Sequence, residues 1–154
     1  MAASSADEDA ALARVETANA EHDAAAITRE LEALLGSERV VLRCCEALQN
    51  DETARAAAAS PGVLLLLLKA LRRHASFAVV AAAWRAMHML LLHGGDSEAV
   101  VEHGALELAL ASIHDTIESA DAVRASLAVF SRLVFPKHVA HAMQLGGVEV
   151  RFHL

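Results

Sequence analysis

The apolar positions of this chain recur mostly at spacings of three and four residues. That spacing places side chains on one face of an α-helix. The clearest stretch, residues 121–135, has these apolar residues at helical spacing: Val123, Leu127, Phe130 and Val134. We therefore expect an amphipathic helix there, ended by Pro136, which cannot continue a regular helix.

The predicted helices follow one another in a repeated order of short, medium and long. One such series comprises residues 51–60, 63–73 and 77–92, and the next comprises 97–102, 105–114 and 121–135. Before them, residues 25–35 and 38–50 are predicted as a medium and a long helix. The stretch 10–26 is alanine-rich with scattered acids and predicts a further, weakly specified helix.

Glycines mark the start of each medium helix. Gly62, Gly104 and Gly147 each precede apolar residues and lie 42 and 43 residues apart. Glycine accepts the backbone angles of a sharp corner without strain. A period of roughly 40–47 residues is typical of stacked helical repeats of the armadillo and HEAT classes.

This period divides the chain into predicted units. We expect a disordered acidic tail over residues 1–10 and a single helical repeat domain over residues 11–154. The units within that domain are predicted as follows: 25–60, 61–95, 96–135 and a partial unit over 136–154.

The predicted helix at 77–92 is apolar on nearly every side. A helix of this kind belongs in an interior. It spans 16 residues and contains Arg85 and His88, whereas a membrane span needs about 20 apolar residues. We therefore expect it between neighbouring helices of a protein that is not inserted in a membrane.

Composition supports helices throughout. Of the 154 residues 55% are hydrophobic, yet only 3% are aromatic and none is tyrosine. Alanine and leucine supply most of the apolar residues, and strand-forming types are scarce. The sequence predicts an all-α fold.

Charge is unevenly placed along the chain. The net charge of −7 belongs entirely to residues 1–60, and residues 61–154 are neutral. A phosphate backbone needs a positive surface. Nucleic acid is therefore not an expected partner.

The adjacent pair Cys44 and Cys45 cannot form a disulfide framework, and the N-terminus lacks the cationic and apolar regions of a signal peptide. We expect both cysteines in a reduced core. The predicted location is the cytoplasm, with the nucleus as an alternative.

In this order of helices the chain resembles the armadillo-repeat family. The family's corner motif is matched by Glu102-His103-Gly104-Ala105 and by Leu145-Gly146-Gly147-Val148, and its third-helix motif by Cys44-Cys45-Glu46-Ala47-Leu48-Gln49-Asn50. The resemblance covers residues 25–154. It implies a right-handed α-solenoid superhelix of about three three-helix repeats. Two-helix HEAT repeats are the alternative.

The resemblance also implies a concave groove, lined by third helices, that binds an extended segment of a partner protein. The positions carried over to this groove are Glu46, Asn50, Arg85, Met89 and Ser131. In relatives that bind nuclear-localisation peptides, tryptophan and asparagine recur on successive third helices. Glu46 and Arg85 stand at two of the tryptophan positions, and Trp84, one residue away, is expected in the core.

Other chemistry finds little support in the sequence. The chain has nine histidines, of which His138 and His141 could share a helix face, but no cysteine lies near them and we expect no metal. Nucleophile, phosphate-loop and zinc-protease motifs are absent, so we expect neither an enzyme nor a cofactor. The basic residues Lys69, Arg72 and Arg73 could meet an acidic partner, the chain's own acidic tail, or only solvent.

Two functions remain open from the sequence. The first is a non-enzymatic interaction module that holds a protein or peptide partner in the groove. The second is a structural part or fragment of a larger assembly, which would contact neighbours, including further copies, through the solenoid ends and the convex face. Solenoid ends expose apolar faces unless a polar repeat covers them.

Overall fold

A computed structural model of the chain describes residues 3–134 and 143–144. Within these residues all regular structure is α-helical and no strand occurs, which confirms the predicted all-α class. The helices are α1 (Ser5–Ala20), α2 (Ala24–Ala33), α3 (Glu38–Ala47), α4 (Asp51–Ala58), α5 (Pro61–Arg73), α6 (Phe77–Leu92), α7 (Ser97–Glu102), α8 (Ala105–Asp115) and α9 (Ala120–Val134).

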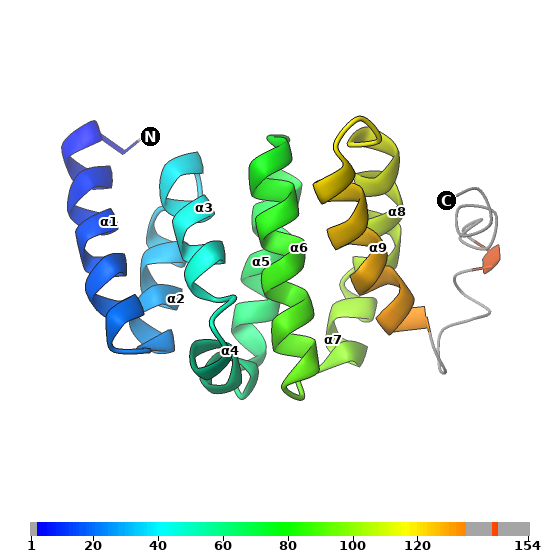
Figure 1. Ribbon diagram of the computed structural model, residues 1–154, viewed down its shortest axis with the longest axis horizontal. Helices are drawn as coiled ribbons and strands as arrows, with labels where there is room; N and C mark the ends of the chain where they lie inside the picture. Colours follow the sequence, from blue (N-terminus) through cyan, green and yellow to red (C-terminus); the bar gives the residue numbers. More distant parts are fainter. Residues whose placement is uncertain (1–2, 135–142, 145–154) are drawn as a thin grey trace.

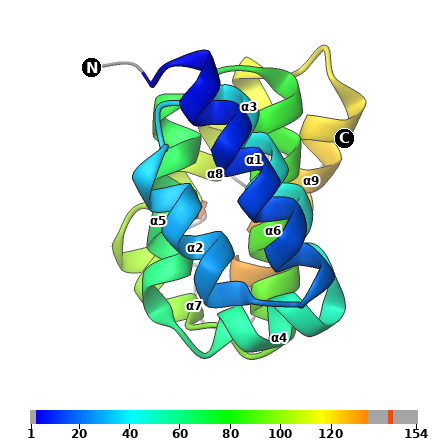
Figure 2. The same cartoon turned by 90° about the vertical axis from the view of Figure 1, so that its left-hand side faces the viewer.

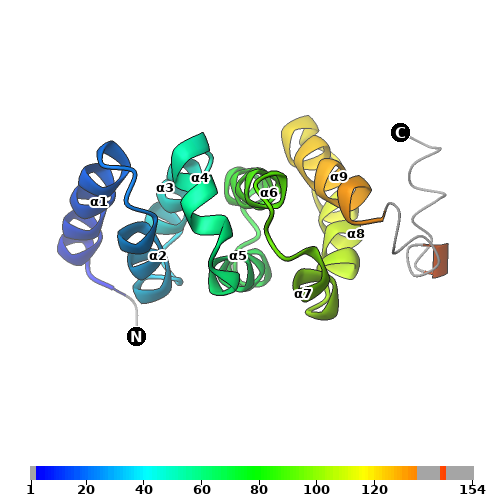
Figure 3. The same cartoon turned by 90° about the horizontal axis from the view of Figure 1, so that it is seen from below.

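The helices form two layers and a lower edge. Helices α1, α3, α6 and α9 lie side by side in one layer, and α2, α5 and α8 lie behind them in the second (Figure 1, Figure 3). The short helices α4 and α7 lie along the lower edge in Figure 1. The end-on view in Figure 2 places α1 and α2 in front of the other helices. The series short, medium and long occurs twice, as α4–α5–α6 and α7–α8–α9, so the fold is repeat-like.

Several helices begin at a polar residue that caps their first turn. The Asp23 carboxylate accepts a hydrogen bond from the backbone N–H of Ala26, and the Asp96 carboxylate accepts one from that of Ala99, each at 3.1 Å. Such bonds satisfy N–H groups that have no partner within the helix. Helix α5 begins instead at a proline, whose backbone angle already suits the first helical position.

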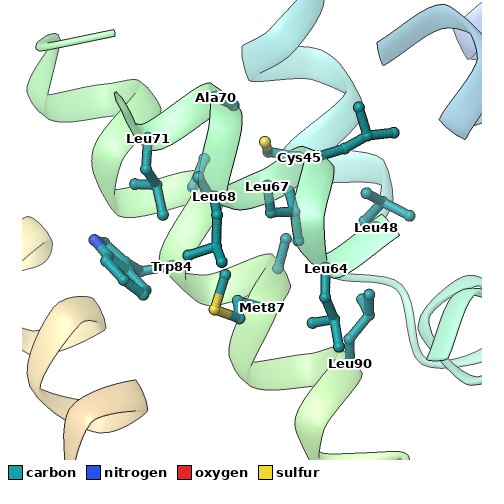
Figure 4. Packing of buried hydrophobic residues seen from close by; sticks show 14 of the residues in the cluster. Cys45, Leu48, Leu64, Leu67, Leu68, Ala70, Leu71, Trp84, Met87 and Leu90 are labelled. Carbon is teal, nitrogen blue, oxygen red and sulfur yellow. The ribbon is translucent and has the colours of Figure 1, made fainter. Parts of the chain in front are cut away.

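Helix α6 runs through the centre of the hydrophobic core. Ten of its sixteen residues are buried, and it packs against both α3 and α9, which confirms the predicted interior position. Figure 4 shows Met87 and Leu90 on the side of α6 that faces Leu64 and Leu68 of α5. Because the full burial of a leucine or methionine side chain is worth about 1.5–3 kcal/mol, this cluster supplies much of the stability.

The expected acidic tail is instead part of the first helix. Residues 5–10 form the opening turns of α1, and a capping box between Ser4 and Asp7 starts the helix. The tail prediction was wrong for these residues because acids near a helix start are stabilised by the first-turn N–H groups and the helix dipole.

Helix α1 is held to its neighbours by charged side chains rather than by a broad apolar face. Its buried residues are Ala11, Val15 and Ala18. Among the described residues four ion pairs connect it to α2 and α3: Arg14 with Glu30 (Nη2 to Oε2, 3.1 Å), Arg39 with both Asp9 (2.8 Å) and Glu8 (3.6 Å), and Glu16 with Arg43. The N-terminal acids therefore pair with arginines of α3, and no such pair with Lys69, Arg72 or Arg73 occurs among the described residues.

Gly104 and Gly62, two of the three glycines that define the sequence period, have different backbone conformations. Gly104 precedes α8 with φ of +88°, the left-handed conformation expected of a corner glycine. Gly62 lies inside α5, and a Cβ added to it would meet no atom within 4 Å. The chain does turn sharply between α4 and Gly62–Arg73, by 107°, but the turn lies before Gly62, because α5 begins at Pro61, two residues before the predicted helix start at residue 63. Gly147 and most of the partial unit 136–154 fall outside the described residues.

Candidate interaction surface

A pocket of about 370 Å³ opens between α3, α6 and the start of α9. Its floor is apolar and is formed largely by Leu42, Phe77, Ala78, Ala81 and Ala82. Its rim is polar and carries Glu46, Gln49, Arg85, Ser119 and Asp121. An apolar floor with a few polar groups around it is the usual composition of a binding pocket.

The small side chains of α6 produce this depression. Ala81 and Ala82 are almost fully buried, yet they reach no further than their Cβ atoms, so the helix surface is low there. The side-chain amide of Gln49 donates to the carbonyl of Ala82 at 3.4 Å and to that of Cys45 at 3.3 Å. These bonds hold the amide at the rim of the pocket, between α3 and α6.

Phe77 supplies the large apolar side chain of the pocket. It is the first residue of α6, and 43% of its surface is exposed. An exposed aromatic residue beside a pocket is a candidate anchor for a partner, because aromatic residues dominate the energetics of protein interfaces.

The charged rim is partly neutralised within the protein. Asp121 accepts a hydrogen bond from Arg124 at 2.8 Å, and Arg85 lies 3.4 Å from the same carboxylate. The hydrogen bond from Arg124 and next the charge of Arg85 lower the pKa of Asp121, so it is ionised at neutral pH. Glu46 lies on the opposite side of the pocket, on α3, and is exposed.

The structure brings together two of the five groove residues inferred from the resemblance. Glu46 and Arg85 line the same pocket. Met89, one turn beyond Arg85 on α6, is half-buried and packs against the core. Ser131 lines a different pocket, with Arg132, Leu91, Gly95 and Ser97.

Asn50 does not lie on the third helix at all. Helix α3 ends at Ala47, and the Asn50 side chain caps α4 by accepting from the backbone N–H of Glu52 at 3.1 Å. The placement of Asn50 on the third helix was wrong because asparagine competes for backbone N–H groups at a helix start. That preference was a usable signal, since Asn50 directly precedes two acids.

Sequence reasoning missed Phe77 and Asp121. The apolar run that contains Phe77 predicted burial of the whole helix, but the first residue lies at the end of α6, where it is less covered. Asp121 was predicted only as the first residue of the helix over residues 121–135. An acid in the first turn of α9, next to the arginine-bearing helix α6, could have suggested the pair with Arg85.

The two cysteines are buried and free. Burial raises the pKa of Cys44 to about 12 and raises that of Cys45 as well. Since the thiolate is the reactive form, neither side chain is suited to nucleophilic or redox chemistry at neutral pH.

Histidines do not gather into a site in the described part of the chain, where no three His, Cys, Asp or Glu side chains lie close enough to hold a metal ion. Burial and next the nearby Arg132 guanidinium lower the pKa of His88, so its ring is neutral at physiological pH. His138 and His141 lie outside the described residues.

In the part of the chain that the structure describes, no single helix has the length and apolar character to cross a membrane. Helix α4 and Gly62–Arg73 together reach that length and composition, but the pair is bent by 107°.

The chain matches no protein-family model, no curated protein and no solved structure.

Proposed function

We propose that this chain is an armadillo-like α-solenoid without enzymatic activity that binds a segment of a partner protein across α3, α6 and α9. The observation that carries the proposal is the pocket in which the exposed Phe77 and the alanines of α6 lie between Glu46 and Arg85. Because this pocket combines an apolar floor with charges of both signs, it suits a peptide with an apolar side chain between polar ones.

The order of helices supports the armadillo assignment. Short, medium and long helices recur, and Gly104 has the left-handed conformation that a sharp corner requires. The helices that the resemblance assigns to the binding side, α3, α6 and α9, share one layer (Figure 3).

The alternative, contact through the ends of the helix row, is less favoured at the α1 end. No large apolar side chain of α1 is exposed: Val15 is buried, Leu12 is half-buried, and the exposed positions are alanines and polar or charged residues such as Ala13 and Asp7. A terminal element without exposed large apolar side chains can remain in water, because the ends of a helix row need a cover only where apolar faces are exposed. We therefore prefer the pocket on the shared layer as the site of contact.

Panning a displayed library of random peptides against the purified chain tests this function. The affinity of the selected peptides is then measured for two variants of the chain. Ala78→Trp fills the pocket, and Ala25→Trp, at an exposed position of α2, is the matched control. We expect Ala78→Trp to weaken binding at least about tenfold and Ala25→Trp to leave it unchanged.

The charge variants Glu46→Arg and Arg85→Glu should change which peptides are selected, because they reverse opposite sides of the rim. A library that yields no binder, or binders that ignore Ala78→Trp, would show that this pocket is not the binding site.

A further inference from the structure

We propose a second docking surface, between α5 and α8, that binds an acidic segment of a partner protein carrying a large apolar side chain. It is distinct from the α3–α6–α9 pocket and does not depend on it. The α5–α8 pocket has a volume of about 410 Å³ and lies between the C-terminal parts of the two helices. Pockets that bind ligands typically measure about 300–1,000 Å³.

The floor of the α5–α8 pocket is apolar. Leu71 of α5 and Val80 of α6 are nearly buried, and Leu108 of α8 is half-buried. Val80 reaches this pocket from one side of α6, while Ala81 and Ala82 line the other pocket. The two pockets are thus separated by α6, and one partner side chain cannot occupy both.

The rim of the α5–α8 pocket is basic, unlike that of the other pocket. Arg72, Arg73 and His74 follow one another along its edge, and one acid, Asp115, lines it opposite them. The Asp115 carboxylate lies 3.4 Å from the ring of His114. In the α3–α6–α9 pocket the balance is reversed, with Glu46 and Asp121 against Arg85. Charge complementarity therefore favours an anionic occupant between α5 and α8.

Two of the three basic residues are fixed by bonds to neighbouring turns. Arg72 donates to the carbonyl of His103 at the α7–α8 corner, and Nε2 of His74 lies 2.8 Å from the carbonyl of Leu35. These bonds hold the end of α5 between the units before and after it. A rim that is ordered before binding loses less entropy when a ligand arrives.

Arg73 lines the pocket and has no ion-pair partner over the ranges that the structure describes. Its guanidinium lies against Gly36 in the turn between α2 and α3, where an added Cβ would come within 2.6 Å of Nη2, so it turns away from Gly36 when it binds an occupant of the pocket. A guanidinium can bind a carboxylate through two parallel hydrogen bonds, which makes such contacts both strong and directional.

The pocket fits an acidic peptide better than a nucleic acid. A phosphate backbone would leave the apolar floor uncovered, and a long polyanion would be repelled by the net charge of −7 of the chain. A short segment with a few carboxylates and a leucine-like side chain satisfies both the rim and the floor.

The chain carries its own reporter of occupancy. Trp84 is the single tryptophan, and its indole N–H donates to the hydroxyl of Ser112 at 3.0 Å. Ser112 in turn lines the α5–α8 pocket. A ligand that displaces water from the pocket changes the surroundings of Ser112 and hence the emission of Trp84.

The experiment titrates the full chain with the acetylated, amidated hexapeptide Glu-Asp-Leu-Leu-Asp-Glu while Trp84 emission is recorded. The comparison peptides are an analogue with Gln and Asn in place of the acids and a hexamer of glutamate. Arg73→Glu is the test variant and Arg55→Glu, the same change at an exposed arginine of α4 that lines neither pocket, is the control. We expect saturable binding of the first peptide only, weakened at least about tenfold by Arg73→Glu and less than about twofold by Arg55→Glu.

The proposal is overturned by any of four results. These are no binding up to about 1 mM, equal binding of the neutral analogue, equal binding of the glutamate hexamer, and equal losses in the two arginine variants. The last two results would indicate general attraction between charges. If Arg73→Glu does not fold, Arg73→Gln replaces it, and the expected loss of affinity is smaller but still exceeds that of Arg55→Gln.

Discussion

The indole N–H of Trp84 on α6 donates a 3.0 Å hydrogen bond to the hydroxyl of Ser112 on α8. Trp84 is fully buried, and Ser112 is almost so. This bond joins the central helix to the second layer and satisfies a polar group that has no access to water.

Removal of the acceptor should destabilise the fold. In Ser112→Ala the indole N–H is left buried without a partner, which costs about 1–3 kcal/mol. Urea unfolding followed by circular dichroism measures this loss. Ser131→Ala on α9, a half-buried serine, is the control and should change the free energy of unfolding much less. Equal stabilities of Ser112→Ala and the unsubstituted chain would show that the hydrogen bond contributes nothing.

The two described glycines of the sequence period should respond in opposite directions to alanine. Gly104 has φ of +88°, where an alanine costs about 1–2 kcal/mol, so Gly104→Ala lowers the free energy of unfolding. Gly62 is helical and open to solvent, so Gly62→Ala raises it by about 0.4–1 kcal/mol. Thermal unfolding of both variants checks the signs. A loss of stability in Gly62→Ala would contradict its helical placement.

Much of the helical framework could be predicted because it depends on local patterns. The apolar spacing along α8 and α9 and the glycine at position 104 each act within a few residues, so they are legible in the sequence. The burial of Trp84 was also predicted and is confirmed, since it lies on a helix that is apolar on nearly every side.

The candidate site was less predictable because it depends on where helices end and meet. Asn50 lies three residues beyond the end of α3, a boundary that periodicity places only to within a few residues. The joint position of Glu46, Phe77 and Asp121 results from the packing of three helices, and no local pattern specifies it. The ion pairs between α1 and α3 likewise join residues that are distant in the sequence. Because these arginine partners cannot be identified from the sequence, the acids at the start of α1 were predicted as a disordered tail.

The ion pair between Glu16 and Arg43 should make stability depend on pH. The hydrogen bond from Arg43 lowers the pKa of Glu16 below its usual value of 4.5. A carboxyl whose pKa is lowered by folding stabilises the fold above its unfolded pKa, and this contribution is lost as the pH falls through the folded pKa. We expect Glu16→Gln to be slightly less stable than the unsubstituted chain at pH 6, and we expect this deficit to be smaller at pH 3, below the usual pKa of 4.5. Urea titrations at the two pH values measure the difference.

Glu32→Gln on α2 is the control for this experiment, because Glu32 is exposed and no ion pair of Glu32 occurs in the part of the chain that the structure describes. A deficit of Glu16→Gln that persists unchanged at low pH would show that its cause is packing rather than charge.

The buried thiols should resist alkylation until the protein unfolds. Burial raises the pKa of Cys44 from 9.0 to about 12, so its thiolate fraction at pH 8 falls roughly a thousandfold. Both cysteines are also inaccessible to a reagent in the folded chain. We expect reaction with iodoacetamide to be at least about a thousandfold slower in buffer than in concentrated urea, as measured by mass spectrometry. Rapid labelling of the native chain would mean that this part of the core opens readily.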